Sequence, residues 1–224
     1  MNPELIITND GSHTLFVPEL KEHYHSTFGA ILESRHVFIE AGLKQILPGH
    51  THVKILEVGF GTGLNAFLSL IEAEKSGKTY YYTSIDPFPL NPDITSQLNY
   101  SELSGIETSS LFKKIHDVEW DREIEITALF FLHKIQNGIE KTGLEDSSFD
   151  LVFFDAFGPD VQPELWTEEI FQKIFLSLKK GGILVTYSVK GSVRRALQNS
   201  GFSVKKIPGP AGKREMTRAI KNED

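Results

Sequence analysis

The order of apolar and polar positions predicts strands and helices that alternate along most of the chain. Five apolar runs have the length of strands, and helix-like segments separate them: 53–60 (VKILEVGF), 79–86 (TYYYTSID), 124–132 (IEITALFFL), 149–157 (FDLVFFDAF) and 182–188 (GILVTYS). The runs that begin at 53, 149 and 182 are almost continuously apolar, which is typical of parallel strands covered by helices on both faces. This pattern predicts an α/β fold around a mostly parallel sheet.

The first fifty residues carry a different pattern. Two short apolar segments, LIIT and HTLFV, flank Asn9-Asp10-Gly11, a turn sequence that favours a β-hairpin. Helical spacing of apolar residues follows from about Phe28 to Leu47. We therefore expect a hairpin and helical extension at 1–50, packed on a core domain at 51–224.

A further helix is predicted before the last of the five runs. Pro163 suits its first turn, and apolar residues then recur every four positions: Trp166, Ile170, Ile174 and Leu178. Because Trp166 lies on this apolar stripe, we expect it in the hydrophobic core.

Composition narrows the functional class. The chain has 224 residues, of which 40% are hydrophobic and 24% charged, enough for one globular domain with a sizeable core. The absence of cysteine excludes disulfides and thiolate metal sites, and no carboxylate cluster or HExxH element accompanies the histidines of HYH at 23–25. No signal peptide or membrane-spanning apolar run is recognisable, so we expect a cytoplasmic protein without a metal.

Charge is unevenly distributed along the chain. Residues 179–224 contain 11 Lys and Arg against 3 Asp and Glu, a charge of +8, whereas residues 1–178 contain 12 against 27, a charge of −15. This basic end includes a second predicted hairpin, 202–207 and 214–220, around a turn rich in Pro and Gly. A polyanionic partner and a merely solvated basic surface both explain such an asymmetry.

The most informative motif is the loop after the first run, EVGFGTGLN at 57–65. Its glycines are spaced G-x-G-x-G, which differs from the dinucleotide-binding pattern, and residues 55–74 lack the Lys of a phosphate-binding loop. Glu57, just before the loop, would repel a phosphate but suits a cationic ligand. The loop therefore indicates a cationic cofactor, although a simple strand-to-helix turn would use the same glycines.

This loop resembles the first motif of the Rossmann-like S-adenosylmethionine-dependent methyltransferases. The resemblance assigns six residues to the cofactor, S-adenosyl-L-methionine: Glu57, Gly59, Gly61, Gly63, Asn65 and Asp86. Asp86 ends the second run, 23 residues after Gly63, where a carboxylate can accept hydrogen bonds from both ribose hydroxyls. The sequence DPFPL at this position is also compatible with a plain turn.

Longer segments resemble the methyltransferase domain of the bacterial MnmC family, which takes part in tRNA 5-methylaminomethyl-2-thiouridine biosynthesis. The matching segments are 24–43 (YHSTFGAILESRHVFIEAGL), 55–65 (ILEVGFGTGLN), 155–166 (DAFGPDVQPELW), 181–197 (GGILVTYSVKGSVRRAL) and 209–216 (GPAGKREM). The resemblance implies a seven-stranded, mostly parallel sheet flanked by helices. The family often carries a fused FAD-dependent oxidase domain, for which this chain is too short, so a free-standing methyltransferase is expected. HKIQNGI at 133–139 lacks the acid that many relatives place near the adenine, which leaves adenine recognition open.

The resemblance also implies a reaction, methyl transfer to the amine of 5-aminomethyl-2-thiouridine at the wobble position of tRNA. Expected partners are tRNA and the enzymes that make the aminomethyl-uridine intermediate. Asp155, at the end of the fourth run, is the predicted proton acceptor, although it could instead cap the loop before Gly158. Phe157 is predicted to face the uracil ring or the sulfonium.

Five basic residues are predicted to contact tRNA phosphates: Lys190, Arg194, Arg195, Lys213 and Arg214. Pairing of these residues with acids of the negative front portion is the alternative.

Two other functions remain compatible with the sequence. One is an amine methyltransferase or aminopropyltransferase that acts on a small molecule or a protein. The other is a non-catalytic RNA-binding domain, which the intact Glu57, glycine loop and Asp86 disfavour. The sequence identifies neither the tRNAs nor the oligomeric state.

Overall fold

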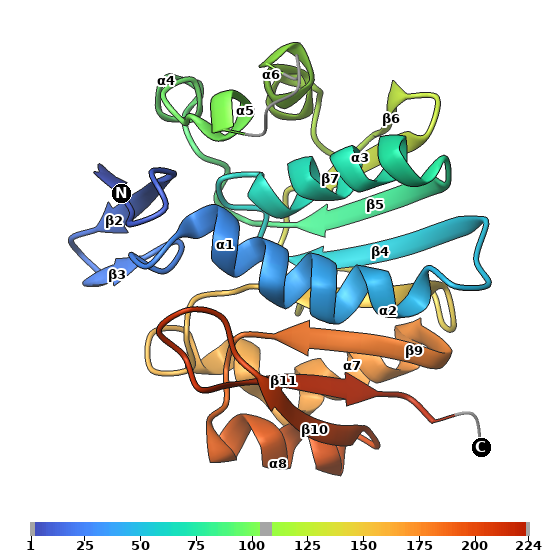
Figure 1. Ribbon diagram of the computed structural model, residues 1–224. Helices are drawn as coiled ribbons and strands as arrows, with labels where there is room; N and C mark the ends of the chain where they lie inside the picture. Colours follow the sequence, from blue (N-terminus) through green and yellow to red (C-terminus); the bar gives the residue numbers. More distant parts are fainter. Residues whose placement is uncertain (1–2, 104–108, 223–224) are drawn as a thin grey trace.

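An eight-stranded sheet forms the centre of the computed structural model, which describes residues 3–103 and 109–222 (Figure 1). The strand order is β10-β11-β9-β8-β4-β5-β7-β6. Strands β7, β5, β4, β8 and β9 are parallel, and β6, β10 and β11 are antiparallel to their neighbours. The predicted α/β fold with a mostly parallel sheet is confirmed. The strand bounds are β4 (His52–Val58), β5 (Thr79–Ile85), β6 (Glu123–Thr127), β7 (Phe130–Ile135), β8 (Phe149–Phe154), β9 (Leu178–Thr186), β10 (Ser203–Pro208) and β11 (Glu215–Ile220).

The predicted number of seven strands is wrong by one, and the cause lies in the apolar run at 124–132. This run was expected to be a single strand, but it reverses direction between β6 and β7, which pair antiparallel. The turn contains neither Gly nor Pro. Instead, the Thr127 hydroxyl accepts the backbone N–H of Leu129 at 3.3 Å, a local side-chain bond that replaces the usual turn residues.

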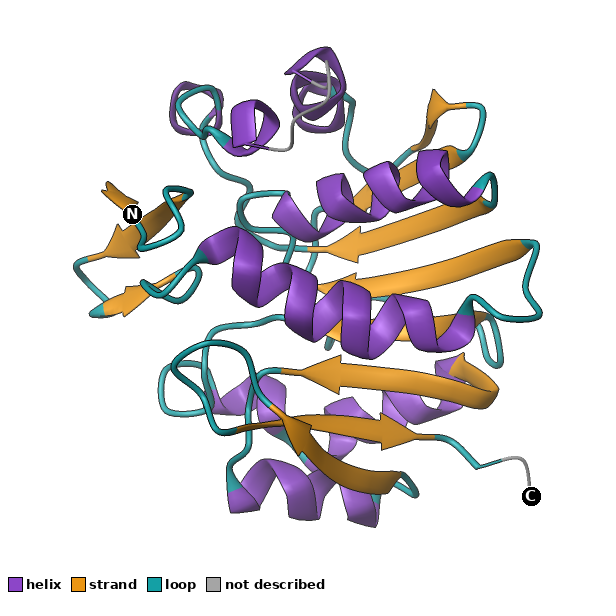
Figure 2. Cartoon of the chain, in the orientation of Figure 1, coloured by secondary structure: helices purple, strands orange, loops and turns teal. Residues whose placement is uncertain are grey.

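Helices cover both faces of the sheet (Figure 2). One layer contains a continuous helix built from α1 (Ala30–Ser34), the π-helical η1 (Arg35–Leu43) and α2 (Lys44–Ile46), beside α3 (Leu64–Ser76) and α6 (Ser109–Asp117). The other layer contains α7 (Glu168–Ser177) and α8 (Gly191–Asn199). Along β8, Leu151 and Phe153 pack into the first layer, whereas Val152 and Phe154 pack into the second. The continuous apolar run of β8 therefore reflects burial on both faces.

The predicted helix after Pro163 is interrupted. A 3-10 turn, η2 (Pro163–Trp166), ends at Thr167, whose side chain accepts the backbone N–H of Ile170 and caps α7. Leu178 begins β9 and lies outside the helix. Trp166 is 5% exposed and its indole N–H donates to the carbonyl of Phe157 at 2.8 Å, so its predicted core position is confirmed.

The predicted terminal hairpins are confirmed. At the N-terminal end, β1 (Glu4–Ile7) and β2 (His13–Val17) pair antiparallel, and β3 (Glu22–His23) adds a third short strand. This small sheet lies beside the carboxyl ends of β4, β5 and β9, as does the loop between β10 and β11 (Figure 1). Two short helices, α4 (Pro92–Thr95) and α5 (Tyr100–Leu103), follow β5. No helix among the described residues is long and apolar enough to cross a lipid bilayer.

Candidate functional site

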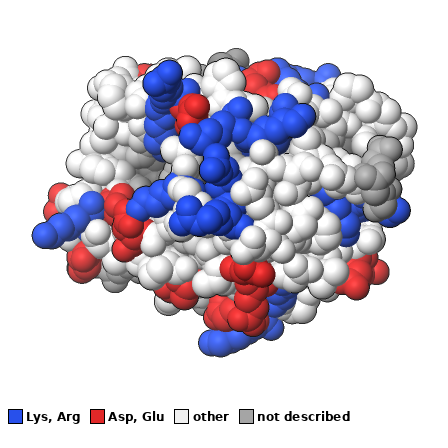
Figure 3. All heavy atoms as spheres, turned by 90° about the horizontal axis from the view of Figure 1, so that it is seen from below, with Lys and Arg blue, Asp and Glu red and all other residues white. Residues whose placement is uncertain are grey.

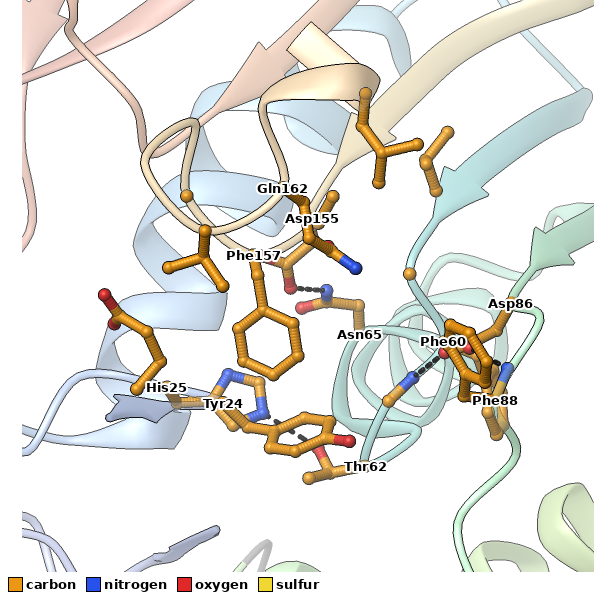
Figure 4. Close-up of a pocket in the computed structure, with 18 of the residues that line it drawn as sticks. Tyr24, His25, Phe60, Thr62, Asn65, Asp86, Phe88, Asp155, Phe157 and Gln162 are labelled. Carbon is orange, nitrogen blue, oxygen red and sulfur yellow. Dashed lines mark hydrogen bonds between the residues drawn. The ribbon is translucent and has the colours of Figure 1, made fainter. Parts of the chain in front are cut away.

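A cavity of about 950 Å³ opens at the carboxyl ends of the parallel strands. In sheets of this kind ligands bind at that edge. Residues that follow β4, β5, β7 and β8 form one part of its wall, and residues 20–28 of the N-terminal segment form another. Figure 4 shows aromatic and polar side chains of these segments gathered around the cavity.

The glycine loop after β4 brings backbone and rings unusually close together. Gly59 has φ +97°, and a Cβ there would lie 2.6 Å from the carbonyl oxygen of Asp155. Gly61 has φ +50°, and a Cβ there would lie 3.0 Å from the ring of Tyr24. These positions therefore require glycine because of neighbouring protein atoms. Gly63 is the N-cap of α3 and lies outside the cavity lining.

Asn65 links two carboxyl groups at the base of the cavity. Its Nδ2 donates to Asp155 Oδ2 at 2.8 Å (Figure 4) and to Glu57 Oε1 at 3.1 Å. Glu57 is fully buried, receives the Ser84 hydroxyl at 2.6 Å and lies outside the cavity lining. Glu57 therefore does not border the cavity itself but helps to position Asn65, which does. The Oδ1 of Asn65 is buried and has no partner within the described chain, so it is available to a ligand N–H donor.

Burial makes both carboxyl groups weak acids. It raises the pKa of Glu57 to about 8 and that of Asp155 to about 7. The nearby Glu33 raises the pKa of Asp155 further, whereas the hydrogen bond from Asn65 and the charge of Lys213 lower it. Asp155 can therefore exchange a proton near neutral pH, as a general base must.

Asp86 ties the glycine loop to the end of β5. Its Oδ2 accepts the backbone N–H of Gly61 at 2.9 Å, and its Oδ1 accepts that of Phe88 at 2.8 Å (Figure 4). A carboxylate offers about four acceptor positions, so capacity remains for ligand hydroxyls. Phe88 is 60% exposed and also lines the cavity. Glu140 lines it from the segment after β7, just beyond the stretch HKIQNGI, which carries no acid.

The N-terminal segment covers the cavity from the opposite side. The ring of Tyr24 packs edge-on against Phe157 with centroids 5.1 Å apart. The neighbouring His25 is buried, and its Nε2 lies 2.8 Å from the Thr62 hydroxyl. Burial lowers the pKa of His25 to about 4, so the ring is neutral near pH 7. Within the described residues, no three His, Asp or Glu side chains gather as a metal would require.

Lys213, predicted to contact phosphate, lies inside the site instead. Its Nζ is 2.7 Å from Glu33 Oε1 and 4.3 Å from the ring centroid of Tyr187. Glu33 Oε2 also accepts the backbone N–H of Ser26 at 2.7 Å. The ammonium is therefore held by a buried carboxylate and an aromatic face, which does not fit the predicted phosphate contact.

The other predicted basic residues lie on the surface. Lys190 pairs with the exposed Asp160. Arg194, Arg195 and Arg214 are exposed, and none of them forms an ion pair within the described chain. α8 and the neighbouring β10 lie at the lower end of Figure 1, and Figure 3 shows Lys and Arg side chains gathered on that face. The alternative in which these arginines pair with acids is therefore not observed among the described residues.

The sequence interpretation missed Glu33, Phe88 and Glu140. Glu33 belongs to the family-like segment 24–43, and it lies in the part that was expected to be helical, where no role was assigned to it. An acid in the first turn of a helix is commonly explained by the helix dipole, so it gave no separate signal. Its burial, at 8% exposure, is visible only in the structure.

Comparisons with known proteins identify the family to which the chain belongs. Residues 105–222 match a family of S-adenosyl-L-methionine-dependent methyltransferases. The tRNA 5-methylaminomethyl-2-thiouridine biosynthesis bifunctional protein MnmC of Campylobacter hominis is 30% identical over 216 residues, 93% of this chain and 31% of that protein. The MnmC of Cupriavidus metallidurans is 29% identical over 231 residues, 96% of this chain and 33% of that protein. The chain thus spans about a third of the length of these relatives.

Solved structures give the same result. The crystal structure of MnmC2 from Aquifex aeolicus is 29% identical, covers 100% of this chain and 71% of that chain, and has a TM-score of 0.75. Spermidine synthase from Thermotoga maritima covers 100% of this chain and 72% of that chain with a TM-score of 0.52, but at 11% identity it shows only a shared fold. The glycine loop, Asp86 and the matched family together establish that the chain belongs to the S-adenosyl-L-methionine-dependent methyltransferases.

Proposed function

We propose that the protein methylates the amine of 5-aminomethyl-2-thiouridine at the wobble position of tRNA. Asp155 carries this proposal, because its carboxyl group has a pKa near 7 and lines a cavity beside the glycine loop. The names of the MnmC relatives, which refer to tRNA 5-methylaminomethyl-2-thiouridine biosynthesis, supply the substrate. A cytoplasmic location, where tRNA is modified, and the enzymes that supply the aminomethyl intermediate belong to the same proposal.

The residues in the cavity fit S-adenosyl-L-methionine. The unpartnered Oδ1 of Asn65 can accept from its ammonium group, and Asp86 has acceptor capacity for ribose hydroxyls. Phe88 offers an exposed ring to the adenine, and Glu140 offers an acceptor for the adenine amino group. When bound there, the cofactor supplies an electrophilic methyl group on a positively charged sulfur.

The protein would contribute mainly position and a proton acceptor. Asn65 fixes the carboxylate of Asp155, which removes a proton from the incoming ammonium and leaves a nucleophilic amine. Tyr24 and Phe157 form an aromatic wall that excludes water from this part of the cavity. Holding nitrogen and methyl carbon at contact distance should account for most of the rate enhancement.

The exposed basic residues supply a surface for the tRNA. Arg194, Arg195 and Arg214 have no ion-pair partner within the described chain, so their charge is available to phosphates. Lys190 forms an ion pair with Asp160, but exposed ion pairs contribute little stability, so Lys190 can exchange this partner for a phosphate. Lys213 is excluded from this set because Glu33 holds it.

A small polyamine is the second candidate substrate. The acceptor side of the cavity contains the carboxyl groups of Glu22, Glu33 and Asp155, which suit a small cationic amine as well as an aminomethyl group. The basic face on α8 and β10 favours RNA (Figure 3).

Nucleoside analysis of tRNA from a strain that lacks the gene would test the proposed function. We expect the unmethylated aminomethyl nucleoside to accumulate, and the wild-type gene but not an Asp155→Asn variant to restore the methylated form. Unchanged tRNA nucleosides would contradict the proposal. Methylation of a polyamine by the purified protein would then identify the second candidate as correct.

A further inference from the structure

An excess of carboxyl groups surrounds the end of the cavity that would receive the amine. Glu22, Glu33 and Asp155 line the cavity and all lie close enough to Tyr187 for their charges to raise the pKa of its hydroxyl further than burial alone does, and Lys213 lies over the ring of the same tyrosine. The carboxyl groups come from separate parts of the chain: β3, α1 and the end of β8. Glu22 and Asp155 have no ion-pair partner within the described chain, so this end of the cavity carries unbalanced negative charge.

From this arrangement we infer that Glu33 recognises the acceptor as a primary ammonium ion and orients it toward Asp155, while Lys213 holds Glu33 in place. This inference rests on the proposed function and adds a specificity-determining residue to it. It also assigns Lys213 a role inside the site instead of on the RNA surface.

The geometry of Glu33 suits this role. Its carboxylate accepts one hydrogen bond at each oxygen, from Lys213 Nζ and from the backbone N–H of Ser26, both at 2.7 Å. A carboxylate can accept about four, so two acceptor positions remain on a side chain that borders the cavity. Glu33 is only 8% exposed, which means that water competes weakly for those positions.

Lys213 holds Glu33 in position and is itself held by neighbouring groups. The Lys213 ammonium is placed by Glu33 and by the ring of Tyr187, whose hydroxyl donates to the carbonyl of Ala156 at 2.8 Å. Ala156 directly follows Asp155. The ion pair and this hydrogen bond thus connect the helix that carries Glu33 to the chain segment that carries the proton acceptor.

An arrangement of this kind selects by charge. An ammonium ion gains Asp155 as a counter-charge and a free acceptor position on Glu33, whereas a neutral hydroxyl or amide would leave Asp155 without a counter-charge, at a desolvation cost. After binding, an N–H bond of the ammonium breaks, an O–H bond forms on Asp155, and the nitrogen keeps the electron pair with which it takes up the methyl group. S-adenosyl-L-methionine, when bound, would supply the methyl group by cleavage of its carbon–sulfur bond; the methylated nitrogen would then carry the positive charge, and Asp155 would hold the proton that it removed.

The charged groups around Asp155 affect its pKa, so the roles of Glu33 and Lys213 can be tested through the pH dependence of the rate. Charged and titratable groups reach it from every neighbouring element: Glu57 on β4, Tyr82 on β5, Tyr187 after β9, Glu33 on α1 and Lys213 before β11. The negative charge of Glu33 raises the pKa of Asp155, and the positive charge of Lys213 lowers it. The acid limb of the pH–rate profile, where the rate falls as Asp155 becomes protonated, should therefore move when either charge is removed. Removal of the Glu33 charge and removal of the Lys213 charge should move it in opposite directions.

The test compares Glu33→Gln, Glu33→Asp and Lys213→Met in methylation of tRNA that carries the aminomethyl nucleoside. For Glu33→Gln we expect kcat/KM to fall about 10-fold or more, mainly through KM, because the variant lacks a charged hydrogen-bond partner for the ammonium. The acid limb should move about half a unit or more to lower pH. Glu33→Asp should retain the wild-type limb, and Lys213→Met should move the limb to higher pH.

Glu40→Gln provides a matched control on the same helix. Glu40 pairs with Lys44 at 2.6 Å, but both side chains are exposed and outside the cavity lining, so its removal should change neither KM nor the acid limb. Cofactor affinity and melting temperature, measured for every variant, separate loss of fold from loss of recognition. Wild-type KM and an unshifted limb in folded Glu33→Gln would overturn the inference while the proposed function stands. An inactive wild type would overturn both.

Discussion

The two halves of the cavity are built in different ways. The half that we propose for the cofactor is built around short stretches after β4 and β5, where Asp86 accepts the N–H of Gly61 in the glycine loop. The acceptor half joins distant segments, and its central ion pair connects Glu33 with Lys213, 180 residues apart. A local motif can thus be retained for one cofactor while distant segments are changed to select another acceptor.

The largest effect is expected from a change that affects the acceptor half alone. Asp155→Asn should lower the rate of methyl transfer by about 10²-fold or more, because the amide cannot take up the proton. Cofactor affinity should hardly change, since Asn65 keeps its bond to Glu57. Single-turnover rates and calorimetry with S-adenosyl-L-methionine measure the two halves separately. Wild-type turnover by the variant would remove Asp155 from the mechanism.

The reverse pattern is expected when the cofactor half is changed. Gly61→Ala places a Cβ 3.0 Å from the Tyr24 ring at φ +50°, which strains the loop by about 1–2 kcal/mol. Cofactor affinity should fall about 10-fold, because the Cβ displaces the Tyr24 ring and the loop, both of which line the cavity.

Gly77→Ala is the matched control for that prediction. Gly77 has φ +66° at the end of α3, but a Cβ there would meet no atom within 4 Å. The Gly77→Ala variant should lose about as much folding stability as Gly61→Ala but keep the wild-type cofactor affinity. Equal affinities in folded Gly61→Ala and wild type would show that the loop geometry does not matter for binding.

A change of pH should also distinguish the halves. Burial raises the pKa of Asp155 to about 7, so the base form is lost as pH falls through 7. At pH 6 the rate should be about one tenth of its plateau value. Cofactor affinity, measured over the same range, should change much less. A rate that stays constant between pH 8 and pH 5.5 would contradict Asp155 as the base.

The smallest effects are expected outside the cavity. Replacing Arg194, Arg195 and Arg214 by Ala should reduce the salt dependence of tRNA binding by about one unit for each of these arginines that binds a phosphate. Lys213→Met should leave the slope unchanged, because Glu33 already holds its ammonium. The slopes come from binding titrations at several salt concentrations. Identical slopes for wild type and the triple variant would place the RNA on another face.

The sequence predicted the glycine loop and Asp86 but not the ion pair between Glu33 and Lys213, and the difference has a physical reason. The glycine loop and Asp86 are determined by local backbone geometry, which leaves a pattern in consecutive residues. Lys213 looked like a surface cation because nothing near it in sequence indicates Glu33, its partner. The division of one predicted strand into β6 and β7 was not predicted for a similar reason. The turn between them is stabilised by the Thr127 hydroxyl and contains no Gly or Pro, the residues that usually indicate a turn.

The central claim is that this cavity joins a methyl donor to the aminomethyl group of a tRNA wobble uridine. Mass spectrometry of nucleosides tests it most directly, after the purified protein has acted on aminomethyl-bearing tRNA with S-adenosyl-L-methionine. We predict that this nucleoside alone gains the mass of one methyl group, and that Asp155→Asn nearly abolishes the gain. An unchanged nucleoside, under conditions where calorimetry shows that the cofactor is bound, would contradict the account.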